Sequence, residues 1–168
     1  MNARHGLADA GGLLARLVTL RGIHPNEPTH DNREFPAMRA RNGSRLERKM
    51  LLAGTDARAA VTARWIHGDG HSASLVRQAG TPEDPNIIAV VASGAGLGGE
   101  QAIVGFVPAP VADKLVACDL LQRAKVGVRQ LKVDTHGRHS TAKVVVDLVA
   151  SIKSRKLYGD RLATDPKS

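Results

Sequence analysis

Aromatic side chains are almost absent from this chain, and their scarcity restricts how its core is built. The 168 residues include one Trp, one Tyr and two Phe, whereas 42% of all residues are apolar. The core must therefore be assembled from Val, Leu, Ile and Ala, and the length suffices for one such domain with an extension. The single Cys118 excludes an internal disulfide and a thiolate-rich zinc site, a pattern typical of a reducing compartment. No apolar run approaches the ~18 residues of a membrane span, so no membrane association is expected.

The charge is strongly basic and unevenly distributed. The formal net charge is +8. Residues 1–50 contain nine Lys or Arg against five Asp or Glu, and residues 101–168 contain twelve against six, whereas 51–100 contain three against five. Two basic flanks around a neutral centre indicate a polyanionic partner.

The N-terminal third differs in composition from the rest. Three prolines within 24–36 and a dense basic cluster behind them predict a basic extended N-terminal arm over residues 1–54, ordered only in its assembly, before an α/β domain at 55–168. The cluster is a candidate RNA contact and consists of Arg39, Arg41, Arg45, Arg48 and Lys49.

Hydrophobic spacing predicts the elements of that domain. Alternation over 57–66 and a polar turn at 67–71 predict a hairpin with 72–78, and the apolar stretch 86–93 predicts a buried third strand. Pro110 opens a predicted helix over 111–125, and 126–134 reads as a strand. Valines at helical intervals, a serine at the start and a late glycine predict a last helix over 140–159. The expected fold is α/β, a mixed sheet in the order strand-strand-strand-helix-strand-helix.

A glycine-rich loop follows the buried strand. Gly94, Gly96 and Gly99 match the dinucleotide-binding fingerprint when taken alone. That site needs a helix immediately after the third glycine, and only eight residues separate Gly99 from Pro108. No crossover helix fits, so we expect no cofactor here.

Two histidine pairs raise an alternative reading. His67 with His71, and His136 with His139, each lie on a glycine-containing turn. Four imidazoles, with Asp69 or Asp134 nearby, could bind zinc or support phosphoester hydrolysis. Polar turn composition explains the same residues, and we expect the turns to hold no metal and to be catalytically silent. A small His-dependent hydrolase stays open as the alternative function.

The second histidine pair belongs to a Gly/Arg turn at the start of the predicted last helix. Backbone amides of a first helical turn, together with nearby cations, form an anion site. The candidate phosphate-binding residues of this turn are Gly137, Arg138, His139, Ser140 and Lys143.

Taken in order, residues 58–160 resemble the universal small-subunit ribosomal protein S-eleven family. The stretch "IIAVVA" followed by "SGAG" resembles the family's strand and Ser-Ser-Ala-Gly turn, and "VGFVPAPVADKLVACDLLQRAK" resembles its helix entry. The stretch "GVRQLKVDTHGRHSTAKVVVDLVASIKSRKL" resembles the following strand, Gly/Arg turn and last helix. The sister fold of large-subunit ribosomal protein L-eighteen has a similar end, and a basic phage or capsid protein shares the charge but not the motif order.

The resemblance implies a structural, non-enzymatic component of a ribosomal small subunit. Its partners would be ribosomal RNA in the platform region and neighbouring small-subunit proteins, with no cofactor and no small-molecule substrate. The basic residues that the family carries after the glycines are missing, and an arm precedes the domain, which implies a mitochondrial ribosome ahead of a cytosolic one. The loop residues that would approach the RNA are Ser93, Gly94, Gly96, Gly98 and Gly99.

Overall fold

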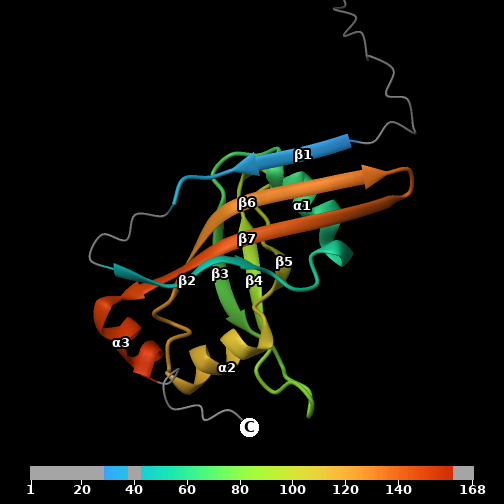
Figure 1. Cartoon of the computed structure of the whole chain (residues 1–168). Coiled ribbons are helices and arrows are strands. Elements are labelled where there is room, and N and C mark those ends of the chain that lie inside the picture. The colour runs from blue at the N-terminus through green and yellow to red at the C-terminus, as the bar shows by residue number, and fades with distance from the viewer. Residues whose placement is uncertain (1–28, 38–42, 161–168) are drawn as a thin grey trace, which may run out of the picture.

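The computed structural model describes residues 29–37 and 43–160 as an α/β fold with two antiparallel sheets. Sheet A has the strand order β1-β6-β7-β2, and sheet B has the order β3-β4-β5. Figure 1 shows the long β6–β7 hairpin lying across α1 and sheet B. The strands are β1 (Thr29–Glu34), β2 (Gly43–Leu51), β3 (Ser72–Arg77), β4 (Ile88–Ser93), β5 (Ala102–Phe106), β6 (Lys125–His136) and β7 (His139–Ser151). The helices are α1 (Ala59–Ile66), α2 (Ala109–Ala117) and α3 (Ile152–Asp160), with 3-10 turns η1 (Asp56–Arg58) and η2 (Ala95–Leu97).

The core lies between sheet A on one side and sheet B with the helices on the other. Val144, Val146 and Leu148 of β7 are fully buried in it, as are Val90 of β4 and Leu115 of α2. Aliphatic side chains make up most of this cluster, as the composition predicts.

Four predicted elements are confirmed in type. The strand over 72–78 is β3, the buried strand is β4, and the strand over 126–134 lies within β6. The helix predicted over 111–125 is α2, but it ends at Ala117, so its second half is wrong. The α/β class is also as predicted, but every described strand pair is antiparallel, so the sheets are not mixed.

Residues 57–66, predicted as a strand of a hairpin, form η1 and α1 instead. The side chains that are buried, Ala59, Thr62, Trp65 and Ile66, recur at helical and not at alternating intervals. The alanine-rich stretch also favours helix intrinsically. The polar turn after it therefore joins a helix to β3, and β3 pairs with β4.

The predicted last helix is also wrong over most of its length. Residues 139–151 form β7, and only Ile152–Asp160 are helical. β7 lies between β6 and β2 with both edges paired, and residues 144–150 are buried without interruption. A strand buried on both faces has a continuous apolar run, which contains helical spacings by coincidence.

The described parts of the predicted N-terminal arm are strands of sheet A. β1 pairs with β6 along the register Thr29↔Thr135 to Glu34↔Gln130, and β2 pairs with β7. Residues 1–28 and 38–42, which contain Arg39 and Arg41, lie outside the described residues.

Candidate functional site

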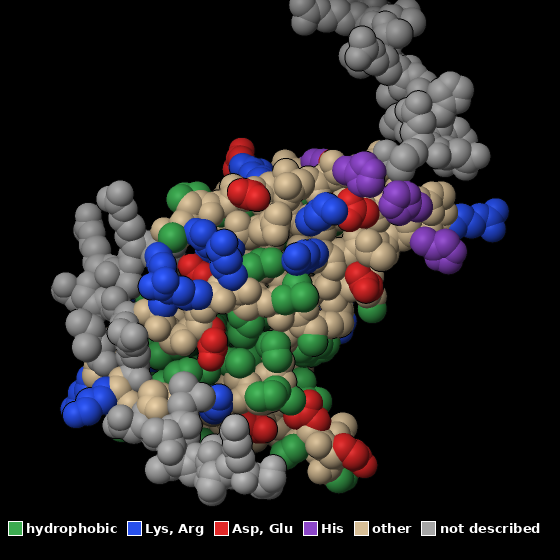
Figure 2. All heavy atoms as spheres, in the orientation of Figure 1, with side chains coloured by type: hydrophobic (Ala, Val, Ile, Leu, Met, Phe, Trp, Pro, Cys, Tyr) green, Lys and Arg blue, Asp and Glu red, His purple; other side chains and the backbone are tan. Residues whose placement is uncertain are grey.

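The face of sheet A opposite α1, here called the outer face, carries a concentration of basic side chains. The inner positions of β6 and β7 point into the core, so alternate residues point outward. Figure 2 shows Lys and Arg side chains gathered over β2, β6 and β7, with a few carboxylates among them. No described helix covers this face in Figure 1. Its cations are Arg45 of β2, Lys125, Arg129 and Lys132 of β6, and Lys143 of β7.

A buried carboxylate lies in the middle of the outer face. Asp147 of β7 is 2% exposed, and its Oδ1 accepts a hydrogen bond from the backbone N–H of Lys49 at 2.9 Å. Its Oδ2 lies 3.7 Å from Nε of Arg45 and 3.6 Å from Nε of Arg129. A buried charge is tolerated only where it is paired, and here one negative charge serves two guanidinium groups. Arg45, Arg129 and Asp147 together keep a net positive charge, and we call these three residues the Asp147 cluster.

The strands on both sides of Asp147 lose their regular register where they pass it. On β2 the register shifts between Glu47 and Met50, and Lys49 has a φ of 48°. On β6 the register shifts between Val128 and Gln130, which leaves Arg129 as the extra residue. Such shifts re-aim side chains at a local cost in the ladder.

A second basic group lies nearer to the tip of the β6–β7 hairpin. Lys132 and Lys143 are directly opposite each other in the register of β6 and β7. They line an open groove of about 400 Å³ together with Thr141, Asp56 and Asp134.

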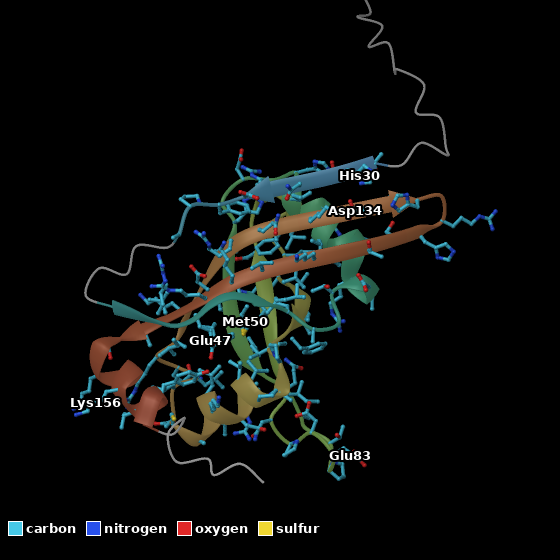
Figure 3. All side chains as sticks on the ribbon, in the orientation of Figure 1. His30, Glu47, Met50, Glu83, Asp134 and Lys156 are labelled. Carbon is cyan, nitrogen blue, oxygen red and sulfur yellow. The ribbon has the colours of Figure 1, made fainter. Side chains whose placement is uncertain are left out.

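Asp134 partly neutralises the positive charge of this second group. Its Oδ2 lies 2.7 Å from Nζ of Lys132, and its Oδ1 lies 2.7 Å from Nδ1 of His30, whose side chain lies next to it in Figure 3. These two hydrogen bonds lower the pKa of Asp134, that from Lys132 most strongly. Among the described residues, no carboxylate lies within ion-pair distance of Lys143.

The predicted anion site at Gly137 rests on a helix start that does not exist. Gly137, with a φ of +61°, and Arg138 form the tight turn of the hairpin, and both are exposed. Ser140 caps no helix, because its hydroxyl pairs with that of Thr135 across the hairpin at 3.1 Å. His139 pairs with His136 in the strand register. RNA contact at this turn stays a prediction, supported by exposure and charge alone.

The glycine loop packs against the end of α1. A Cβ on Gly96 would lie 2.1 Å from the carbonyl oxygen of Arg64, and one on Gly68 would lie 2.0 Å from the backbone N of Gly96. Glycine is therefore needed here for contact between two backbones of the protein itself. The strand β5 follows the glycines, where a dinucleotide site would need a helix.

The remaining loop residues are placed differently. Gly94 borders the Trp65 indole, whose Nε1–H donates to the carbonyl oxygen of Ser93. Gly98 and Gly99 have φ values of +67° and +83°, with open space around the position of a Cβ. RNA contact by this loop stays a prediction.

The two histidines of the first pair contact separate protein groups. Nε2 of His67 lies 3.3 Å from Oδ2 of Asp31, and Nε2 of His71 lies 2.7 Å from the carbonyl oxygen of Trp65. Burial lowers the pKa of His71. In the described part of the chain, no three His, Cys, Asp or Glu side chains form a group that could bind a metal ion. The zinc and hydrolase reading therefore gains no geometric support.

The central residues of the outer face were not predicted from sequence. Arg45 and Lys49 were in the predicted basic cluster, and Lys143 was in the predicted turn, but Arg129, Lys132 and Asp147 were missed. One signal was available, because Asp147 is the single charged residue in the buried run 144–150. A lone carboxylate in such a run requires a charged partner from another strand.

Comparisons with known proteins give no family for the chain. No family model and no curated protein match it. A search of solved structures finds similarity to the crystal structure of the HIRAN domain of human HLTF, with 16% identity and a TM-score of 0.38 over 73% of this chain and 91% of that chain. A superposition this loose carries no argument about function. No described helix is long and apolar enough to cross a membrane.

Proposed function

We propose that this protein binds RNA through the outer face of sheet A, mainly by contacts to backbone phosphates. The observation that carries the proposal is the arrangement of cations on that face. Lys132 and Lys143 are directly opposite on neighbouring strands, and like charges in this position destabilise a sheet. Asp134 offsets part of that repulsion through its ion pair with Lys132, and a phosphate group beside Lys143 would remove the rest.

The positions of the aromatic residues support backbone contacts over base stacking. Trp65 and Tyr158 are buried in the core, Phe106 lies under Arg58, and Phe35 packs against His71. These four are all the Trp, Tyr and Phe residues of the chain, so the outer face offers no such ring on which bases could stack. Electrostatic binding of this kind depends weakly on sequence and strongly on salt.

The finer proposal is that the RNA is ribosomal and that the protein is a structural component of a small subunit, in mitochondria. Its support is the basic composition and the motif resemblance over β4, α2 and β6. Sedimentation of tagged protein through a gradient tests it. We expect co-sedimentation with small subunits that is lost after RNase treatment. Migration as free protein in untreated extracts would reject the ribosomal role and leave the RNA-binding proposal standing.

Removal of the opposed lysines tests the RNA-binding proposal. We expect the double variant Lys132→Ala, Lys143→Ala to bind a fluorescent RNA hairpin more weakly in anisotropy titrations. The slope of log affinity against log salt should fall by about two units, for two lost phosphate contacts.

A matched control removes two arginines from elsewhere on the molecule. Arg64 lies on α1 and Arg77 on β3, and both are exposed. The double variant Arg64→Ala, Arg77→Ala changes the net charge equally, and we expect it to bind as the parent does. Equal losses in both double variants would show that net charge alone attracts the RNA. Absence of binding by the parent protein would reject the proposal.

A further inference from the structure

The Asp147 cluster differs from the other cations of the outer face because the surrounding backbone fixes its geometry, whereas the other cations are only exposed. Two strands shift register beside Asp147, and Lys49 adopts a left-handed conformation that L-residues rarely take. Strained backbone persists where the surroundings hold it in place, and it concentrates at functional sites. In this case the Asp147 carboxylate holds it, through the hydrogen bond from the N–H of Lys49.

The geometry of the two arginines leaves donors for a ligand. Each guanidinium approaches Asp147 by its Nε, at 3.7 Å for Arg45 and 3.6 Å for Arg129, which is longer than a hydrogen bond. Nη1 of Arg129 donates to the carbonyl oxygen of Phe35. Within the described residues, Nη1 and Nη2 of Arg45 have no hydrogen-bond acceptor. Asp147 thus orients both guanidinium groups, and some of their N–H donors remain without an acceptor.

We infer that Arg45 and Arg129 hold one phosphate group between them and that Asp147 is the positioning residue. The planar guanidinium matches the oxygens of a phosphate in a way that an ammonium group does not. Asp147 attracts the Nε side of both guanidinium groups without a hydrogen bond, which leaves the terminal nitrogens of Arg45 and Nη2 of Arg129 for the ligand. The inference rests on the proposed function for the source of the phosphate, which is the backbone of the bound RNA. Lys132 and Lys143 would attract the phosphate by their charge, whereas the Asp147 cluster would also fix its orientation.

Charge-preserving substitutions separate geometry from charge. Arg45→Lys keeps the net charge, and the Arg45 side chain is 31% exposed, so the fold should tolerate the change. We expect it to weaken binding of the RNA hairpin about tenfold, the size of one charged hydrogen bond, with little change in the salt slope. The matched control is Arg64→Lys on α1, away from the outer face, which also keeps the charge and should bind as the parent does.

Asp147→Asn tests the positioning role, because the two explanations predict opposite changes in RNA affinity. The variant gains one positive charge, so a merely electrostatic face would bind RNA more tightly. Asparagine can still accept the Lys49 N–H, but it no longer holds two guanidinium groups. We therefore expect weaker binding despite the added charge. Thermal unfolding of each variant shows whether it is folded, and Arg45→Lys decides alone if Asp147→Asn is not.

Two outcomes separate the failure of this inference from that of the proposed function. If Arg45→Lys binds RNA as the parent does, while the Lys132→Ala, Lys143→Ala variant is weakened, the inference is overturned and RNA binding stands. If the parent binds no RNA, a thermal shift with inorganic phosphate is decisive. Stabilisation that disappears in Arg45→Lys would retain the phosphate site and reject RNA as its source, and no stabilisation would reject both.

Discussion

The glycine loop at 93–99 and the hairpin turn at 137–138 both contain glycines in a polar setting, yet the structure uses them oppositely. In the loop, Gly96 lies against the backbone of α1, and a Cβ would overlap the Arg64 carbonyl oxygen. In the turn, Gly137 has nothing within 4 Å of a Cβ position, and only its φ of +61° requires glycine. The same residue type thus answers a packing need in one region and a conformational need in the other.

The largest expected effect is at the packed glycine. Gly96→Ala places a methyl group 2.1 Å from a backbone oxygen, so α1 and η2 must move apart. We expect a loss of about 3 kcal/mol in the free energy of unfolding, measured by chemical denaturation. Gly98→Ala in the same loop is the control, because its Cβ meets nothing and only the left-handed φ is strained. Equal stabilities of the two variants would show that the close approach at Gly96 is unimportant.

A smaller loss is expected at the hairpin turn. Gly137→Val forces a β-branched residue into the left-handed region, which costs about 1–2 kcal/mol. Gly137→Asn should cost less, because Asn tolerates that conformation. Denaturation measures both. A Val variant as stable as the Asn variant would mean that the turn changes type without penalty.

The pH dependence of the free energy of unfolding should depend on the partly buried His71 and not on a histidine at the exposed hairpin turn. Burial lowers the pKa of His71 below that of the unfolded chain, so the unfolded chain binds a proton first as the pH falls. His71 therefore stabilises the fold above its unfolded pKa, and this contribution declines below about pH 6.5. We expect His71→Gln to flatten the decline of unfolding free energy between neutral and mildly acidic pH. The exposed His139→Gln is the control, and an equal change in both variants would contradict the assignment.

The smallest effect on stability is expected at Arg138. Its side chain is exposed at the tip of the hairpin, so Arg138→Ala should change the free energy of unfolding by less than about 0.5 kcal/mol. If the turn contacts RNA, the slope of log affinity against log salt should fall by about one unit. An unchanged slope and affinity would confine RNA binding to the outer face.

The sequence was sufficient where one element alone determines the pattern. β4 has an apolar run closed by glycines, and α2 begins at a proline-rich signal, so β4 and the start of α2 were located correctly, whereas the end of α2 was not. The sequence was insufficient where the secondary structure of a segment depends on the strands that pair with it. β7 is a central strand of sheet A that is buried along 144–150, and its continuous valine run satisfies either periodicity.

The Asp147 cluster could not be assembled from sequence for a related reason. Lys49 and Asp147 are separated by 98 residues, and no local spacing links them. Only the antiparallel pairing of β2 with β7 brings Arg45 beside the carboxylate. An isolated Asp in a valine run indicated a charged partner without saying which one.

The pairing of the N-terminal strands with the β6–β7 hairpin also dictates an order of assembly. The hairpin is a local structure that closes on its own two-residue turn, whereas His30 and Asp134 are 104 positions apart in the chain. During synthesis β1 and β2 leave the ribosome long before their partners exist, so β1 stays unpaired until β6 is made and β2 until β7 is made. We therefore expect sheet A to form from the C-terminal hairpin outward. A chain that ends before His139 would lack β7 and would leave the edge of β2 open to other molecules.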